Sequence, residues 1–283
     1  MILTFDRRDR ERLHQMWDDI IDSNQWSTYD KPAKYTDQFE TLWSQWNNAY
    51  SVSTATWSGA AMAALKYIDV KNEVVLCPSF TWIATPMSIA ESGGKVVYVE
   101  INKRDLCMSY DDFVIKCKLY SPKAVFVVHI GGHIAFDIDR ISQYCNDNNI
   151  ALIEDCAQAH GASWGKKMPG TWGDAGIYSF GPTKTLTTGE GGMLVSKHKA
   201  LTDFARGYIY YGKPNDYAST GLNWKMNEFT SAIGVLQTLR LSEIVKVKNA
   251  YVDTNLRTKH PNTVNLPTDM VSGYFKYIVF DNN

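Results

Sequence analysis

The sequence predicts an α/β protein in which a mostly parallel central sheet is flanked by helices on both faces, an αβα sandwich. Segments of helical spacing alternate with four short apolar runs, at Val74 to Cys77, Val96 to Val99, Ala124 to His129 and Ile150 to Ile153. This alternation is typical of βαβ units, whose parallel strands are covered by helices on both sides. Ligands of such sheets bind at the carboxyl ends of the strands, so functional residues are expected directly after the apolar runs.

The other elements follow from periodicity and from turn residues. A helix is expected around Phe39 to Trp46, and a strand at Tyr50 to Thr54 leads into a helix from Ala60 to Ile68. The first forty residues show no clean period, which suits an arm that lies on another surface. The remaining predicted helices are Trp82 to Ala90, Asp111 to Cys117, Asp139 to Asn146, Leu201 to Tyr210, Asn227 to Leu241 and Glu243 to Leu256, and the remaining strands are Ala175 to Phe180, Met193 to Val195 and Tyr274 to Phe280.

Composition and charge exclude several classes of partner. The 283 residues carry 29 basic and 30 acidic side chains, a net charge of -1, so no global field attracts nucleic acid or an anionic membrane. The five cysteines are widely spread and contain no C-x-x-C pair, so neither a disulfide framework nor a metal site is expected. The charged N-terminus and the absence of a membrane-spanning apolar run favour a cytoplasmic protein.

One lysine stands between two predicted strands. The run Ala175 to Phe180 stops at Gly181-Pro182, and the run Met193 to Val195 follows a segment of three glycines. Lys184, on the loop between them, is a solvated charge, a phosphate ligand, or an amine that forms a Schiff base with a carbonyl compound. Taken alone, the residue fits a solvated charge best, because most lysines are exposed.

Residues after other predicted strands change that balance. The turn Thr56 to Gly59 joins a strand to a helix and can point free N–H groups at an anion, although from this segment alone a plain helix cap by Thr56 or Ser58 is the better explanation. Of Glu154 and Asp155, one is expected to face the site and the other to face away, because strand side chains alternate. His160 fits a structural histidine at least as well as a ligand.

A single small molecule would use all of these features. Pyridoxal 5'-phosphate (PLP) combines a flat ring, a basic ring nitrogen, a phosphate and an aldehyde. Lys184 would bind the aldehyde, and Asp155 would keep the ring nitrogen protonated. Trp82 would stack on the ring, and Ser58 and Ser179 would contact the phosphate.

Five motifs follow one another along the chain. They are T-W-S-G-A-A-M-A-A-L from Thr56, P-S-F-T-W-I-A-T from Pro78, I-E-D-C-A-Q-A-H-G from Ile153, Y-S-F-G-P-T-K-T-L-T-T-G-E-G-G from Tyr178 and G-L-N-W-K-M-N-E from Gly221. In this order they resemble a known family, the DegT/DnrJ/EryC1/StrS aminotransferases, which are PLP-dependent enzymes of fold type I that act on nucleotide-linked sugars. The resemblance runs from about Tyr35 to Phe280, and the lysine segment with T-T-G-E-G-G is its most specific part.

The resemblance implies roles for individual residues. It places the catalytic, cofactor-anchoring lysine on Lys184, the aspartate for the pyridine nitrogen on Asp155 and the partner of the phenolic oxygen on Gln158. It implies ring stacking by Trp82. The implied phosphate contacts are Ser58, Gly59, Ser179 and, across a homodimer interface, Asn223 of the neighbouring subunit.

The resemblance also implies a reaction. An amino group passes from L-glutamate to a keto group of a nucleotide-linked deoxy sugar, in amino-sugar and polysaccharide biosynthesis such as that of lipopolysaccharide O-antigen. A branch of the family that dehydrates sugars carries histidine at the lysine position, so Lys184 favours amination. Two alternatives remain, a PLP-dependent sugar dehydratase or lyase and a truncated, inactive PLP-binding remnant.

Two departures from the family pattern bear on these expectations. Lys225 stands where the family has arginine, which keeps the charge but loses the bidentate fork. Family chains also continue beyond the run Tyr274 to Phe280 into a small domain that closes over the substrate. We therefore expect an N-terminal arm at 1–35, a large PLP-binding domain at 36–242 and only the start of a small C-terminal domain at 243–283.

Overall fold

The central sheet confirms the predicted α/β class. The structure is a computed structural model that describes residues 5–28, 33–213 and 220–281. Within these residues the main sheet has seven strands in the order β1-β8-β7-β5-β4-β2-β3. Strand β8 runs antiparallel to both of its neighbours, and the other adjacent pairs are parallel, so the sheet is mostly parallel.

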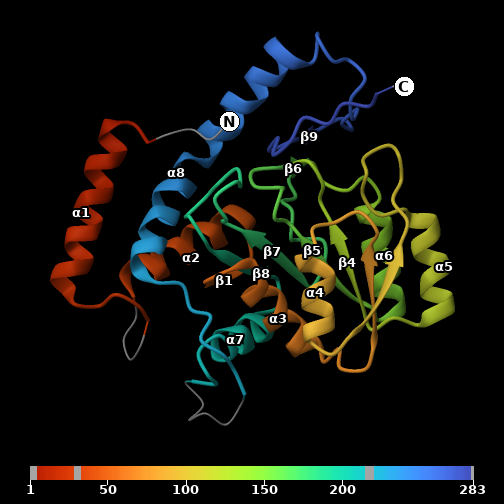
Figure 1. Cartoon of the computed structure of the whole chain (residues 1–283), viewed down its shortest axis with the longest axis horizontal. Helices are drawn as coiled ribbons and strands as arrows, with labels where there is room; N and C mark the ends of the chain where they lie inside the picture. Colours follow the sequence, from red (N-terminus) through yellow and green to blue (C-terminus); the bar gives the residue numbers. More distant parts are fainter. Residues whose placement is uncertain (1–4, 29–32, 214–219, 282–283) are drawn as a thin grey trace.

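The elements follow the predicted alternation of strands and helices (Figure 1). A two-stranded sheet of β6 and β9 accompanies the main sheet. The helices are α1 (Arg7–Ser23), α2 (Lys34–Asn47), α3 (Trp57–Ile68), α4 (Ala84–Glu91), α5 (Tyr110–Tyr120), α6 (Ile138–Asn148), α7 (Lys199–Tyr208) and α8 (Glu228–Tyr251), with a π-helical turn at Val252–Leu256. The strands are β1 (Tyr50–Thr54), β2 (Val74–Pro78), β3 (Lys95–Val99), β4 (Ala124–Val128), β5 (Ala151–Asp155), β6 (Ser163–Trp164), β7 (Ala175–Ser179), β8 (Gly192–Ser196) and β9 (Met270–Val271).

Helices cover both faces of the main sheet, and side-chain alternation decides which cluster each strand residue joins. Ile177 of β7 packs with α3 and α7 on one face, whereas the next residue, Tyr178, packs with α2 and α8 on the other. On that second face, α5 and α6 cover the half of the sheet nearer β3. Because both faces are covered, the inner strands β2, β4 and β7 are almost entirely apolar, and polar side chains emerge where the strands end.

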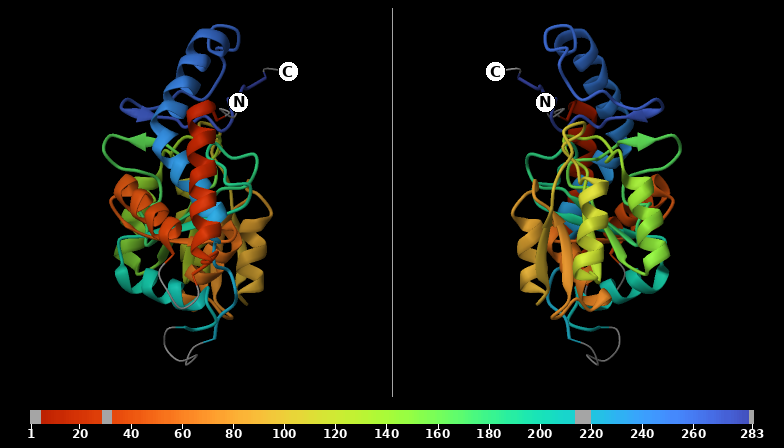
Figure 2. Two further views of the ribbon diagram at one scale, coloured as in Figure 1. Left: turned by 90° about the vertical axis from the view of Figure 1, so that its left-hand side faces the viewer. Right: turned by 90° about the vertical axis from the view of Figure 1, so that its right-hand side faces the viewer.

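Helix α1 was not predicted. It lies beside α8 (Figures 1 and 2) and packs on it through the buried residues Leu13, Met16 and Ile20. The Asp6 side chain caps its first turn by accepting from the Asp9 N–H at 2.8 Å. Part of the expected arm is therefore a helix; residues 1–4 and 29–32 of that arm lie outside the described ranges.

The C-terminal region differs from the prediction in two ways. Helix α8 is continuous from Glu228 to Tyr251, across the division expected between residues 242 and 243, where two helices were predicted. The strand predicted at Tyr274 to Phe280 is wrong, since that segment has only an isolated bridge between Thr263 and Val279. A strand needs a neighbour to pair with, and this segment lies instead along the glycine loop at Gly131 and Gly132.

Among the described helices, none combines the length and the apolar character that crossing a membrane requires.

Candidate active site

A cavity of about 420 Å³ opens at the carboxyl ends of the parallel strands. Val128, Asp155 and Ser179, the last residues of β4, β5 and β7, line it together with the first turn of α3. This is the edge where ligands of such sheets bind. Six of the predicted site residues meet there: Ser58, Trp82, Asp155, Gln158, Ser179 and Lys184.

Asp155 is buried and held by three donors. Its Oδ1 accepts from Trp57 Nε1 at 3.1 Å and from the Ala157 N–H at 3.0 Å, and its Oδ2 accepts from Thr85 Oγ1 at 3.0 Å. Burial raises the pKa of Asp155, although these hydrogen bonds and the charge of Lys184 act in the opposite direction. The sequence analysis missed Thr85 and the Trp57 indole as partners, because a contact between separate elements leaves no local pattern.

Lys184 supplies the complementary charge from the loop between β7 and β8. Burial lowers the pKa of its amine, and nearby Lys276 adds to the effect, whereas Asp155 opposes it. The Nζ atom lies 5.1 Å from the centroid of the Phe275 ring. Among the described residues, neither Lys184 nor Asp155 forms a salt bridge, so a ligand could pair with each of them.

The first turn of α3 forms one wall of the cavity. Thr56 caps the helix, with Oγ1 accepting from the Gly59 N–H at 3.3 Å. Gly59 is buried and does not line the cavity, and an added Cβ would collide with the Trp224 ring. The Gly59 N–H is therefore already used by the helix cap, whereas Ser58, before it in the helix, lines the cavity. A contact between Gly59 and a phosphate stays a prediction.

The other lining residues surround the space between Asp155 and Lys184. Gln158 Oε1 accepts from the Gly131 N–H at 2.8 Å, which leaves the amide NH₂ group free to donate. Ser179 Oγ accepts a long bond from the Gly181 N–H at 3.4 Å. Trp82 is 72% exposed at the mouth of the cavity.

Asn223 does not join this group. It is exposed, lies outside the cavity lining, and its Oδ1 accepts from Lys225 Nζ at 2.7 Å. Lys225 in turn lies 4.0 Å from the centroid of the Tyr210 ring. A role for Asn223 in the neighbouring subunit's site stays a prediction.

Two polar residues of the motif at the end of β5, Glu154 and His160, are structural. Glu154 faces away from the cavity, as expected for the neighbour of Asp155, and accepts from the N–H groups of Gly170, Trp172 and Gly173. His160 is buried among aromatic rings, and burial, with a smaller effect of the charge on Lys184, lowers its pKa to about 3. A neutral, buried imidazole supports the structural interpretation of His160.

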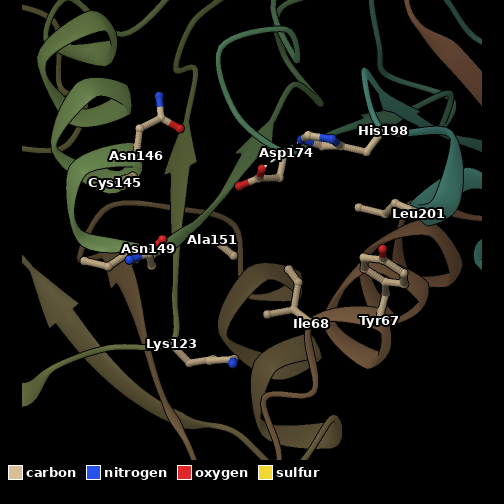
Figure 3. A pocket seen from close by; sticks show the side chains of 11 residues that line it. Tyr67, Ile68, Lys123, Cys145, Asn146, Asn149, Ala151, Asp174, His198 and Leu201 are labelled. Atoms are coloured by element: carbon tan, nitrogen blue, oxygen red, sulfur yellow. Dashed lines mark hydrogen bonds and ion pairs between the residues drawn. The ribbon is translucent and has the colours of Figure 1, made fainter.

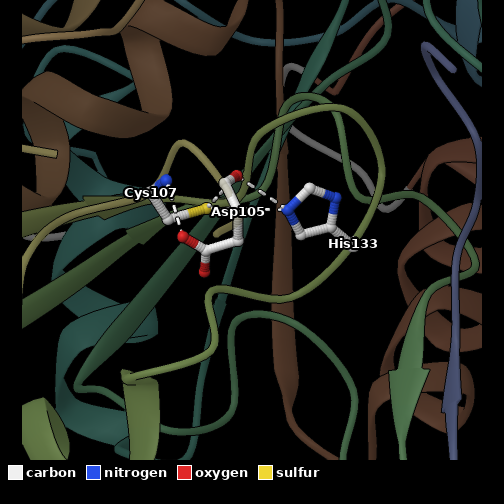
Figure 4. A group of neighbouring side chains, drawn as sticks. All are labelled: Asp105, Cys107 and His133. Carbon is white, nitrogen blue, oxygen red and sulfur yellow. Dashed lines mark hydrogen bonds between the residues drawn. The ribbon is translucent and has the colours of Figure 1, made fainter. Parts of the chain in front are cut away.

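A second polar group, Asp105, Cys107 and His133, lies close together without forming a convincing metal centre (Figure 4). Asp105 Oδ1 accepts from the Cys107 N–H at 3.0 Å, and Oδ2 accepts from the Phe136 N–H. His133 Nε2 lies 3.0 Å from the Asp105 carbonyl oxygen, which makes it the donor. These groups already satisfy one another, so the cluster holds two loops together.

A second cavity, of about 460 Å³, lies at the opposite edge of the sheet. Lys123 and Asp174 precede β4 and β7, and His198 follows the antiparallel β8 (Figure 3). His198 Nε2 lies 3.1 Å from Asp174 Oδ1. This cavity therefore faces away from Lys184 and from the carboxyl ends of the parallel strands.

The donor set of the first cavity fits PLP. A buried carboxylate suits a protonated ring nitrogen, an amine of lowered pKa suits an aldehyde, and the first turn of a helix suits a phosphate. Asp155, Lys184 and Ser58 supply these three groups around one cavity. The residues present therefore match the parts of the cofactor that the sequence predicts.

Comparison with known proteins agrees with this site. The DegT/DnrJ/EryC1/StrS aminotransferase family model matches residues 7–280. A GDP-perosamine synthase of Vibrio cholerae is 35% identical over 239 residues, covering 81% of this chain and 63% of that protein. Another, of Escherichia coli O157:H7, is 29% identical over 227 residues, covering 78% of this chain and 62% of that protein. The chain thus spans somewhat over 60% of the length of these two relatives.

Among solved structures, a GDP-4-keto-6-deoxymannose-3-dehydratase with a trapped PLP-glutamate geminal diamine has the same fold. The TM-score is 0.82 at 20% sequence identity, covering 99% of this chain and 78% of that one. This likeness concerns the fold, whereas the family model covers nearly the whole sequence. The chain belongs to the DegT/DnrJ/EryC1/StrS aminotransferase family.

Proposed function

We propose that this chain is a PLP-dependent aminotransferase that transfers an amino group from L-glutamate to a keto group of a nucleotide-linked deoxy sugar. The observation that carries the proposal is the presence, in one cavity, of the half-buried Lys184 amine and the buried Asp155 carboxylate, neither in a salt bridge within the described residues. The family membership supports amination, and the names of the two GDP-perosamine synthases support a nucleotide-linked sugar.

In this proposal Asp155 and Gln158 hold the two ends of the ring. A carboxylate offers about four acceptor positions, and protein donors take three of those of Asp155, which leaves one for a ring N–H. The Gln158 NH₂ group would donate to the phenolic oxygen, because Gly131 fixes the amide oxygen on the other side. Trp82 would cover the ring face, and Ser58 and Ser179 would bind the phosphate.

Lys184 would both anchor the cofactor and move a proton. When bound, PLP supplies an electron-poor ring that makes the α hydrogen of an amino acid acidic. With its amine free, Lys184 would accept at Nζ the proton from the α carbon of glutamate as general base, and would donate that proton again as general acid. Burial helps here, because a lowered pKa leaves more of the amine neutral and able to accept a proton.

A homodimer forms part of the proposal. Phe80, Trp82, Ile83 and Met87 are all large, apolar and about half or more exposed. Trp82 lines the cavity, and the other three flank it along the chain, up to the first turn of α4. Clustered exposed apolar side chains favour a subunit interface. A second copy seated there would bring Asn223 of the partner subunit to the phosphate, and cofactor binding would then depend on dimerisation.

Dehydration is the alternative, and the fold does not separate the two reactions, since a dehydratase structure and aminotransferase structures share it. Lysine at position 184 supports amination instead, because the resemblance implies histidine there in dehydratases. The division into arm, large domain and partial small domain, and a cytoplasmic location, stay predictions.

The test uses L-glutamate with an isotopically labelled amino nitrogen, PLP and GDP-4-keto-6-deoxymannose, with mass spectrometry of the sugar nucleotide. The proposal predicts a product that carries the label with the wild-type chain and none with Lys184→Ala. A product that has lost water and carries no label would support the dehydratase. If this sugar is not converted, single-turnover formation of 2-oxoglutarate from glutamate would still support an aminotransferase with another acceptor; its absence would contradict the proposal.

A further inference from the structure

Helix α8 contacts three consecutive residues, 185–187, of the loop that carries Lys184. Gln237 Nε2 donates to the Thr187 carbonyl oxygen at 3.2 Å, and Lys248 Nζ donates to Thr185 Oγ1 at 3.1 Å. Leu186, between the two, is fully buried in the cluster that includes α8. The backbone between Gly181 and Leu186 forms neither helix nor strand. A turn hydrogen bond from the Lys184 N–H to the Gly181 carbonyl oxygen at 3.1 Å and the contacts with α8 therefore hold this loop in place of a regular ladder.

Lys248 also contacts a third segment. Its Nζ donates to the Tyr274 carbonyl oxygen at 3.1 Å, and the residue is only 8% exposed. The segment that contains Tyr274 is tied to the far side of the cavity, because the Gly273 N–H donates to the Gly132 carbonyl at 2.8 Å and the Lys276 N–H to the Gly131 carbonyl at 2.9 Å. One amine therefore links α8, the loop of Lys184 and the C-terminal segment.

The C-terminal segment reaches the reactive lysine directly. Residue 275, next to the carbonyl that Lys248 binds, places its phenyl ring 5.1 Å from Lys184 Nζ. A ring at this distance stabilises an ammonium and restricts where it can lie. Movement of this segment relative to the loop would therefore move the ring relative to the amine.

A lysine at position 248 does not favour the stability of the fold. Its described partners are a hydroxyl and a carbonyl, both neutral, and no carboxylate within the described residues pairs with it. Burial, helped by the charge of Lys276, lowers the pKa of Lys248 to about 8, so burying the ammonium is costly. An apolar side chain of similar length would remove that cost.

We propose that Lys248 is a positioning residue for Lys184, which fixes the loop against the C-terminal segment by holding Thr185 and Tyr274 at the same time. The inference rests on the proposed role of Lys184 as the cofactor-binding amine. The proposal predicts different effects of Lys248 on the stability of the fold and on the position of the Lys184 amine. Loss of Lys248 leaves the fold as stable as before or more so, but misplaces the amine.

The test compares Lys248→Met and Thr185→Val with Lys246→Met, an exposed lysine on the same helix, as the matched control. Thermal unfolding gives stability, and borohydride reduction at timed intervals followed by peptide mapping gives the rate at which PLP becomes attached to Lys184. Because a misplacement on the order of 1 Å can cost about a hundred-fold in rate, we expect attachment at least about ten-fold slower in both variants. The double variant should be no slower than the slower single variant, since both remove one interaction.

The unfolding midpoint and the attachment rate together test the proposal. An unfolding midpoint no lower than that of the Lys246→Met control, combined with slow attachment, supports the positioning role. Attachment at the control rate contradicts it, as does a loss of stability with a normal rate per folded molecule. If Lys248→Met does not fold, Thr185→Val decides on the same criteria. Attachment that persists unchanged in Lys184→Ala would instead contradict the proposed function. That result is distinguishable from a failure of the Lys248 proposal, because it concerns Lys184 itself.

Discussion

At the scale of single residues, the site depends on two opposite charges that burial disfavours. Burial raises the pKa of Asp155 and lowers that of Lys184, and the attraction between them opposes both shifts without overcoming them. Such a pair is poorly suited to stabilising the empty chain. It is well suited to a ligand that brings a protonated nitrogen to Asp155 and a carbonyl to Lys184.

Substitution of Asp155 by Asn should stabilise the cofactor-free protein and weaken cofactor binding. A carboxyl whose pKa is raised on folding contributes stability only while protonated and loses it as the pH rises through the folded pKa. The stability difference in favour of Asp155→Asn should therefore grow between pH 4 and pH 8 in urea unfolding, while PLP affinity falls by about ten-fold or more. A wild type that is the more stable of the two at pH 8 would contradict this.

Two charged neighbours, Lys276 and Asp155, should change the neutral fraction of the Lys184 amine in opposite directions. The positive charge of Lys276 lowers the pKa of Lys184, and the negative charge of Asp155 raises it. Only the neutral amine attacks an aldehyde, so the attachment rate should rise with pH up to that pKa. Lys276→Gln should move the midpoint of this profile to higher pH and Asp155→Asn to lower pH; shifts in the same direction would exclude the mechanism.

At the scale of elements, α3 has a double role, because its capped first turn is also a wall of the site. Thr56→Ala should cost about 1 kcal/mol in the free energy of unfolding and should also weaken PLP binding. Ser109→Ala is the control, since Ser109 caps α5 in the same way, with Oγ accepting from the Asp112 N–H at 3.5 Å, far from the cavity. Equal loss of cofactor affinity in both variants would show that the effect is general destabilisation.

Elements with a strong local pattern were predictable from the sequence, and elements defined by their neighbours were not. The apolar runs of β4 and β5 predicted buried parallel strands, and with them the position of Asp155 at a strand end. The apolar residues Leu13, Met16 and Ile20 of α1 are sparse among charged residues, and only α8 explains their burial. The run from Tyr274 to Phe280 has the composition of a strand but no strand beside it.

The site residues also fall into those that local sequence predicts and those that only the packing of elements explains. Lys184 and Asp155 stand in specific motifs and are brought together by the parallel sheet, so their meeting could be predicted. Thr85 and Lys248 come from helices whose sequence says only that they are helical, and their contacts with Asp155 and Thr185 depend on how those helices pack.

At the scale of the whole molecule, the exposed apolar residues at the cavity mouth predict self-association. Ile83 and Met87 are 61% and 49% exposed and stand four residues apart, on one side of the start of α4. Ile83→Asp and Met87→Asp should shift sedimentation towards the monomer and reduce retention of PLP. Leu119→Asp, at a 68% exposed position of α5, should change neither. A wild type that sediments as a monomer at every concentration would contradict the prediction.

The central claim is that Lys184 binds the cofactor in the cavity that Asp155 lines. Peptide mapping after borohydride reduction of the PLP-loaded protein tests this claim most directly. The claim predicts one reduced pyridoxyl group per chain, on the peptide that contains Lys184, and none on Lys248 or Lys276. Lys184→Ala should carry no such group. A modification spread over exposed lysines, or one that is equally abundant in Lys184→Ala, would contradict the claim.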